Sequence, residues 1–437
     1  MTDKKAFWKI AWPIILSGLG QSGFSIIDGI VVGQILGTKG LASLAVGGAF
    51  FFVIMFLGIA ASGIFSPLLA SKKGEIDELA STFKHTLLFN FLIATAIVII
   101  CWFSRPLLFY IQKSDQILEV AYDYLTIRLF SAYGMMGFLS FKRLAEGLEK
   151  TQWVLWAVMI AAIFNVITNY CLMVGVGDWP GLGLVGTAIA MLLTGVVECL
   201  LLAYFLGREV PGIWKAVRKS SWKWQQQKFV SYLAIPTGVY GFLESGLFYA
   251  STFIASAVSI ELSAAHFIVM HAMALLYRFL YAFSVATGVR IGVYWKENDI
   301  EKINTTWRYS LTVTAVFLLI ASCIVLLLRE QIVYLFAKPQ HGNNVLHTAS
   351  ELIVWGTLLK WFDGIQMMNH SYLKGIQRPF PIFYHGVIAY LLIGLSLALQ
   401  ATTIIGIWQA LAFAMCCNAG MSFRGVHKAR NSLQLNR

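Results

Sequence analysis

Long apolar runs follow one another along nearly the whole chain, separated by short polar segments. A helix needs about 20 apolar residues to cross the hydrocarbon core of a bilayer. We predict twelve spans, at residues 8–34, 42–70, 83–104, 118–141, 153–174, 184–207, 228–258, 263–289, 307–328, 347–372, 380–400 and 404–423. Lipid offers no partners for open backbone groups, so strands and irregular segments are excluded at this depth. The pattern predicts an all-α polytopic membrane protein with twelve transmembrane helices.

Composition excludes a soluble domain of this length. Of the 437 residues, 58% are hydrophobic and 12% are charged, whereas soluble domains carry roughly 25% charged residues. Mean hydropathy is +0.71. The six cysteines lie in or beside apolar runs, without a C-x-x-C pair or a partner at metal-ligand spacing. We therefore expect no metal site and no cofactor.

The net charge of +12 is distributed unevenly between the loops. With the N-terminus inside, the cytoplasmic segments hold 25 Lys and Arg residues and the outer segments hold five. This bias predicts a multi-pass protein of the cell (inner) membrane with both termini in the cytoplasm. Because topology accounts for the basic charge, we expect no nucleic-acid partner.

The two halves of the chain repeat one pattern. The sequence AWPIILSGLGQSG at 11–23 matches AIPTGVYGFLESG at 234–246, which aligns Pro13 with Pro236. Each proline removes one backbone hydrogen bond early in its span and permits a bend there, although a proline at a helix start has the same appearance. We therefore name both as candidate hinges.

A hydrophilic linker divides the spans into six and six. The predicted organisation is an N-lobe at 1–207, a cytoplasmic interlobe linker at 208–227 and a C-lobe at 228–437, with Gly147 aligned to Gly375. Both halves start on the same side of the membrane, so they are parallel repeats related by an axis along the membrane normal. Two six-helix lobes around a central cleft are typical of transporters.

Acidic residues inside the predicted spans are the first candidates for a site. A charged side chain at the bilayer centre costs about 2.5 to 3.5 kcal/mol on insertion scales, so such residues usually mark an ion or substrate path. Asp28, Glu244 and Asp363 are the candidates, and Gln21 shares a helical stripe with Asp28. A structural Asp28 that locks its helix through hydrogen bonds is the alternative.

Polar neighbours accompany two of these acids. Asn165 and Asn169 are one turn apart and can offer carbonyl oxygens near Asp28, or form a plain interhelical hydrogen bond. Tyr240 lies one turn before Glu244 on the same helical face.

The third acid has a basic neighbour. Lys360 lies three residues before Asp363. The two residues form either an ion pair that lowers the cost of membrane insertion or a charge pair that is exchanged when substrate or ion binds. Met270 and Tyr277 share a stripe suited to cation-π contact with an organic cation, or to ordinary core packing.

These motifs together resemble the multidrug and toxic compound extrusion (MATE) family, in its NorM-like bacterial branch. The resemblance covers essentially the whole chain. It is carried by A-x-P at Ala11 and Pro13, IIDGIVVGQILGTKGLASLAVG at 26–47, N-V-I-T-N at 165–169, GLGLVGTAIA at 181–190, and the acids of the seventh and tenth spans. It implies a secondary antiporter, not an enzyme and without catalytic residues, that exports drugs or metabolites, often cationic, in exchange for H⁺ or Na⁺ by rocking its two lobes.

The resemblance also assigns site residues. Asp28 occupies the family's acidic position in the first helix, and Glu244 with Asp363 matches the acidic pair of the C-lobe. Asn169 stands where members with an N-lobe sodium site carry Asp, and Thr187 lies one turn from the usual threonine. These departures favour proton coupling at Asp28, or an ion at the C-lobe pair.

Two other functions remain alternatives. A flippase for lipid-linked saccharides or lipids, from the same superfamily, requires a strongly cationic cleft. A membrane-embedded enzyme requires a catalytic motif, and no H-E-x-x-H, P-loop or nucleophile elbow occurs in the sequence. The partners that we expect are a small organic cation or drug and membrane lipid, bound by a monomer.

Overall fold

The computed structural model describes residues 3–104, 106, 115–336 and 343–435. Within its helices, the side chains of residues 3, 22–31, 33–42, 45–46, 49–50, 104, 115–120, 260–262, 336 and 343 lie outside the description. The described chain is helical, with one isolated β-bridge between Val176 and Trp179 and no strand.

The chain forms two compact units. One unit comprises Trp12–Ala234, and the other comprises Met1–Ala11 together with Ile235–Arg437. Residues 1–11, which we predicted in the N-lobe, therefore belong to the unit that contains the C-terminus, and residues 228–234, which we predicted in the C-lobe, belong to the other unit. Both segments lie near the start of a long helix. These helices are α1 (Asp3–Ser62) and α10 (Trp224–Val258).

The unit Trp12–Ala234 contains most of α1 and the helices that follow it. These are α2 (Phe65–Ala70), α3 (Ile76–Ser104), α5 (Asp115–Arg128), α6 (Ser131–Gly147), α7 (Thr151–Val174), α8 (Leu184–Glu209) and α9 (Ile213–Lys219). The structure differs from the predicted spans in three places. The predicted span at 42–70 is divided between α1, which ends at Ser62, and α2, which begins at Phe65. The helical assignment of α1 continues through residues 35–41, which we expected to separate two spans. The predicted span at 118–141 is divided between α5 and α6, with a break at 129–130.

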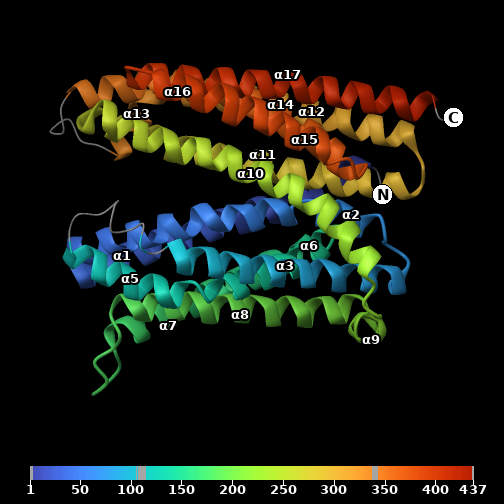
Figure 1. The fold of residues 1–437 in the computed structure, drawn as a ribbon, viewed down its shortest axis with the longest axis horizontal. Coiled ribbons are helices and arrows are strands. Elements are labelled where there is room, and N and C mark those ends of the chain that lie inside the picture. Colours follow the sequence, from blue (N-terminus) through green and yellow to red (C-terminus); the bar gives the residue numbers. More distant parts are fainter. Residues whose placement is uncertain (1–2, 105, 107–114, 337–342, 436–437) are drawn as a thin grey trace. The chain divides into compact units, whose positions relative to one another are not determined.

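The second unit contains the rest of α10 and the remaining helices. These are α11 (Ile260–Lys296), α12 (Ile300–Leu327), α13 (Arg329–Phe336), α14 (Asn343–Gly375), α15 (Phe380–Gly386), the π-helix η2 (Val387–Leu395), α16 (Ser396–Gln400) and α17 (Ile404–Leu435). Figure 1 shows α14 running alongside α12 and α17, and α14 packs against α11, α12 and α17. Polar residues of α14 therefore lie inside the unit.

Two glycines at repeat-related positions let helices approach closely. A Cβ on Gly147 in α6 would lie 2.9 Å from the Cβ of Leu69 in α2, and a Cβ on Gly375 in α14 would lie 2.7 Å from the Cβ of Ile291 in α11. Real Cβ atoms essentially never come so close. The predicted alignment of Gly147 with Gly375 thus corresponds to the same packing device in each unit.

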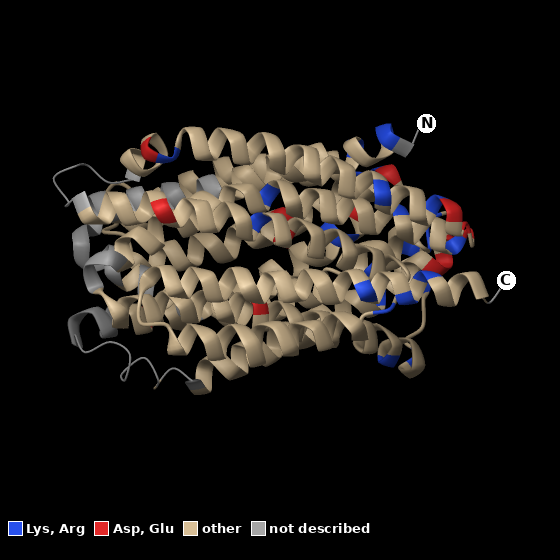
Figure 2. Cartoon of the chain, turned by 90° about the horizontal axis from the view of Figure 1, so that it is seen from above, with Lys and Arg blue, Asp and Glu red and all other residues tan. Residues whose placement is uncertain are grey.

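Eight helical segments of the described chain are long and apolar enough to cross a membrane. The predicted spans at 8–34, 118–141, 228–258 and 347–372 have no counterpart among these eight segments. The span at 118–141 is divided between α5 and α6, which have 14 and 17 residues. Figure 2 shows many of the Lys and Arg residues toward the end of the picture where the C-terminus lies.

Candidate functional site

A buried acid and base form an ion pair on α14. The Nζ of Lys360 donates to Oδ2 of Asp363 at 2.7 Å, and both side chains are almost completely buried. Three residues separate them, so the helix places the two groups on one face. Each charge compensates the other at membrane depth, which lowers the cost of burying them.

Gln366 connects this pair to the acid of α10. Its Nε2 donates to Oδ1 of Asp363 at 3.2 Å and to Oε1 of Glu244 at 2.9 Å. Gln366 is fully buried and lies one turn beyond Asp363. The two carboxylates are therefore held in one network, bridged by a neutral amide.

Two tyrosines and an asparagine complete the network. The hydroxyls of Tyr390 on η2 and Tyr240 on α10 donate to Oε1 of Glu244 at 3.0 and 3.2 Å, and they lie 3.0 Å from each other. Tyr390 also lies 2.9 Å from Oε1 of Gln366. The Nδ2 of Asn418 on α17 donates to Tyr390 at 2.6 Å and also to Gln366. Side chains from four elements of one unit, α10, α14, η2 and α17, thus form one network that includes Glu244.

The two carboxylates of this network differ in surroundings. Asp363 is 2% exposed and paired with Lys360, whereas Glu244 is half-buried. Among the described residues, Glu244 has no ion-pair partner, and all three of its hydrogen bonds reach Oε1. Oε2 therefore has no hydrogen-bond partner among the described residues, and Glu244 is the more exposed of the two acids.

The predicted stripe on α11 contributes one contact to this network. The ammonium group of Lys360 lies 5.4 Å from the ring centroid of Tyr277, in the geometry of a cation-π contact. Met270 packs against the hydrophobic core of the unit. Tyr277 therefore contacts the network, whereas Met270 contributes to core packing.

The predicted polar residues of the first unit lie on α7 and α8. Asn165 is 3% exposed, and its Nδ2 donates to Oγ1 of Thr194 at 3.0 Å, while no described residue is within hydrogen-bonding range of its side-chain carbonyl. Asn169 is buried, and Oγ1 of Thr187 lies 3.7 Å from Sδ of Met173. Asn165 therefore presents a buried oxygen, as an ion ligand requires.

Asp28 is the acid that we expected near Asn165 and Asn169. Asp28 belongs to α1, but its side chain lies outside the described residues. Gln21 is half-buried on the same helix. The predicted stripe through Gln21 and Asp28 therefore stays a prediction.

The two candidate hinges lie inside helices. Pro13 is within α1, which begins at Asp3, and Pro236 is within α10, which begins at Trp224. Neither proline is therefore in a first helical turn, where its missing N–H would cost nothing.

Sequence reasoning missed three members of the network: Gln366, Tyr390 and Asn418. Gln366 carries a signal that was available, because it lies three residues after Asp363 on the same helical face. Nothing in the sequence singles out Tyr390 or Asn418, because a single tyrosine or asparagine within an apolar helix is common.

Comparison with protein families gives a match to each half of the chain. The MatE family model matches residues 13–171 and 236–400. The matches begin at Pro13 and Pro236, the two prolines that the internal repeat aligns.

Curated relatives cover nearly the whole chain. The probable multidrug resistance protein NorM of Photorhabdus laumondii is 25% identical over 435 residues, which is 94% of this chain and 93% of that protein. The multidrug resistance protein MdtK of the same organism is 23% identical over 400 residues, covering 90% of this chain and 87% of that protein.

Solved structures share the fold. The eukaryotic MATE transporter AtDTX14 superimposes with a TM-score of 0.87 at 16% identity, over 99% of each chain. A MATE protein in complex with MaD5 gives a TM-score of 0.85 at 19% identity, over 99% of this chain and 97% of that one. These matches confirm the predicted fold of twelve transmembrane helices in two lobes.

Proposed function

The chain belongs to the MATE family of multidrug efflux transporters, and we propose that it is an antiporter that exports organic, cationic drugs or metabolites in exchange for H⁺ or Na⁺. Its relatives are transporters rather than enzymes, which sets aside the membrane-enzyme alternative. We place it in the inner membrane as a multi-pass monomer with both termini in the cytoplasm, and propose alternating access as its transport cycle.

The observation that carries the proposal is the charge balance of the buried network. Lys360 compensates Asp363, so the network retains the single negative charge of Glu244. A lone carboxylate at membrane depth is costly unless a cation or a proton neutralises it. Because either a coupling ion or a cationic substrate satisfies this requirement, the two ligands compete for one group, which is the basis of exchange.

The chain crosses between its two units next to the candidate hinges. One crossing falls between Ala11 and Trp12 and the other between Ala234 and Ile235. Both Pro13 and Pro236 are the second residue after a crossing. A bend at each proline would let the units move while both helices stay intact, as alternating access requires.

Each helix start is anchored on the unit that it joins. The Nε1 of Trp8 donates to the hydroxyl of Tyr309 on α12 at 3.2 Å. In the other unit, Oγ of Ser81 on α3 donates to Oε1 of Gln226 at the start of α10, at 2.9 Å. Residues 76–87 of α3 match residues 300–311 of α12 at a constant offset of 224, so both helix starts are anchored on repeat-related helices, although through residues that the repeat does not align. The paired anchors support a similar role for the two prolines.

Exchange in proteoliposomes tests the proposal. Glu244→Gln removes the uncompensated charge, and we expect it to abolish ion-driven export of a cationic drug. Asp28→Asn, which changes the acid proposed for the first unit, is compared in parallel to learn which acid carries the ion. Drug efflux and Na⁺ or H⁺ influx are recorded together, with the ion gradient imposed across the vesicle membrane.

Glu351→Gln is the matched control, because Glu351 is an exposed acid on α14, the helix of Asp363. We expect this variant to export at the wild-type rate. Ion-driven export that survives in both Glu244→Gln and Asp28→Asn would exclude the proposed antiport mechanism. Ion-independent movement of a lipid-linked saccharide by the wild type would favour the flippase.

A further inference from the structure

A cavity of about 320 Å³ opens between the start of α12 and the end of α17. The lining residues are Ile300, Glu301, Asn304, Thr305 and Arg308 from α12, and Arg430 and Gln434 from α17. Its volume is at the lower end of the range for ligand pockets, roughly 300 to 1,000 Å³. It lies wholly within the second unit, apart from the Glu244 network.

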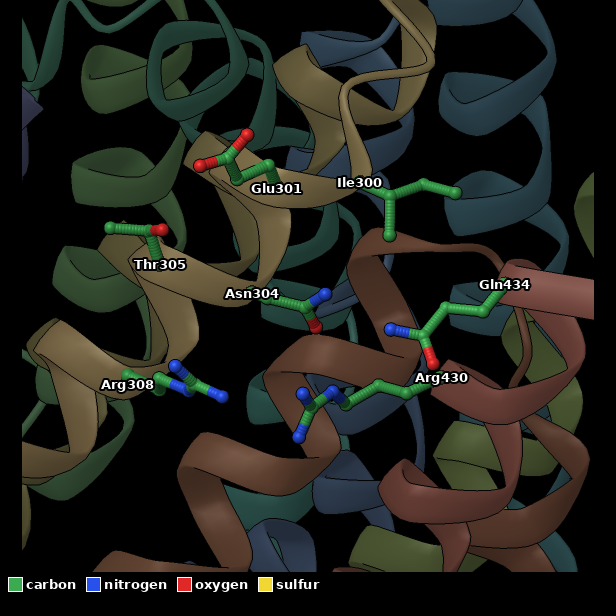
Figure 3. Close-up of a pocket in the computed structure, with 7 residues that line it drawn as sticks. All are labelled: Ile300, Glu301, Asn304, Thr305, Arg308, Arg430 and Gln434. Carbon is green, nitrogen blue, oxygen red and sulfur yellow. The ribbon is translucent and has the colours of Figure 1, made fainter. Parts of the chain in front are cut away.

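Two arginines and two amides point into this cavity. Figure 3 shows the guanidinium groups of Arg308 and Arg430 directed toward each other, with the side-chain amides of Asn304 and Gln434 above them in this view. The carboxylate of Glu301 points away from this group. The converging groups therefore present hydrogen-bond donors with a charge of +2.

These arginines lack an acidic partner in the described part of the chain. No described carboxylate lies within ion-pair distance of Arg308 or Arg430. The Nε of Arg430 is buried without a hydrogen-bond partner among these residues. Unpaired buried donors are costly, so a bound anion would remove a penalty that the protein alone leaves in place.

The structure holds Arg430 in position. Its guanidinium lies 5.4 Å from the ring centroid of Trp307, and Nε1 of Trp307 donates to Oδ1 of Asn369 at 3.0 Å. Trp307 is 4% exposed. A fixed aromatic platform orders the arginine before any ligand arrives, which reduces the entropy lost on binding.

Guanidinium forks match the oxygens of a phosphate group in a bidentate manner. Lipid-facing side chains point to the source of that phosphate. Leu319 and Leu326 lie three and five turns beyond Arg308 on the same face of α12, and both are exposed. Phe423 lies two turns before Arg430 on α17 and is 50% exposed. Apolar surface suited to acyl chains therefore lies on both helices, two to five turns from the arginines.

We propose that this cavity binds the phosphate of an anionic phospholipid headgroup at the membrane surface. Basic pockets between transmembrane helices on the cytoplasmic side are suited to such headgroups. Arg308 and Arg430 hold the phosphate oxygens, Asn304 and Gln434 donate to the remaining oxygens or to the headgroup, and the acyl chains follow the exposed faces of α12 and α17. Bound lipid then joins the start of α12 to the end of α17.

Thermal unfolding of the purified full-length protein in detergent tests this site. Short-chain phosphatidylglycerol is titrated, with short-chain phosphatidylcholine, glycerol 3-phosphate and inorganic phosphate as comparison probes. We expect phosphatidylglycerol to raise the unfolding temperature of the wild type. Arg308→Gln or Arg430→Gln should weaken its apparent affinity about tenfold or more, the effect of losing one charge-assisted hydrogen bond.

Arg424→Gln is the matched control, because Arg424 is exposed on α17 and does not line the cavity. It should respond to phosphatidylglycerol as the wild type does. Arg308 is exposed, so Arg308→Gln supplies the readout if Arg430→Gln does not fold. Equal protection by glycerol 3-phosphate or inorganic phosphate would keep the phosphate site but overturn lipid as its source. An unchanged response in both cavity variants would overturn the site.

Discussion

At the scale of single residues, Tyr390 is the centre of the acidic network. It is 1% exposed, and its hydroxyl lies within hydrogen-bonding distance of Glu244, Gln366, Tyr240 and Asn418. A hydroxyl has one proton to donate and two lone pairs to accept, so these contacts depend on one another. The network is therefore sensitive to loss of this one oxygen.

Tyr390→Phe removes that oxygen and with it the hydrogen bonds to Glu244, Gln366 and Asn418. We expect a loss of about 1 to 3 kcal/mol in the free energy of unfolding. Ion-dependent export should fall as well, because Glu244 loses one of its three donors. Tyr384→Phe on α15 is the control, since Tyr384 is 57% exposed. Thermal unfolding and vesicle transport measure both effects. Equal stability of the two variants would mean that the hydroxyl of Tyr390 does not stabilise the protein.

At the scale of helices, close approach depends on glycine at two repeat-related positions. Gly147 lets α6 pack onto α2 in one unit, and Gly375 lets α14 pack onto α11 in the other. Without large side chains at these points, helices gain van der Waals contact that lipid tails do not supply. α14 also carries Lys360, Asp363 and Gln366, so its packing positions the network.

Gly375→Ala should force α14 away from Ile291. We expect it to destabilise the protein by about 1 to 3 kcal/mol, the usual cost of overpacking a core. Gly147→Ala should act similarly through Leu69. In contrast, Gly246→Ala on α10 meets no described atom within 4 Å and should be neutral or slightly stabilising. Unfolding temperatures in detergent compare the three variants, and equal temperatures would show that the helices separate without cost.

At the scale of the whole molecule, the charge balance of the network bears on energetics. One carboxylate that is neutralised by either ligand exchanges one H⁺ or Na⁺ for one monovalent drug cation, so a cycle moves no net charge. The membrane potential supplies about 2.3 kcal/mol per charge per 100 mV only when charge is moved. The proposed exchange is therefore driven by the concentration gradient of the ion.

Varying the membrane potential at a fixed ion gradient tests this stoichiometry. In proteoliposomes with a K⁺ ionophore, export of a monovalent cation should stay nearly constant as the potential changes. A neutral substrate should be exported faster when the inside is negative, because its cycle moves one positive charge inward. Cation export that rises steeply with inside-negative potential would require a second coupling ion, for which Asp28 is the candidate.

The sequence alone determined the membrane class, the helical fold, the repeat and the family, because each depends on local or linear features. Bilayer thickness converts apolar length into a span, and the aligned Pro13 and Pro236 reveal the repeat without knowledge of packing. It also found Glu244, Asp363 and Lys360, since charges in apolar helices stand out. The roles of these residues stay predictions.

Only the tertiary structure decided how those groups are connected. Gln366 and Tyr390 donate to Glu244, and Asn418 donates to both of them; these three residues come from three different elements, brought together by packing between helices distant in sequence. The same holds for Arg308 and Arg430, which are 122 residues apart and line one cavity. Hydrophobic periodicity specifies which face of a helix is buried but not which helix covers it, so partners across helices follow from the three-dimensional fold alone.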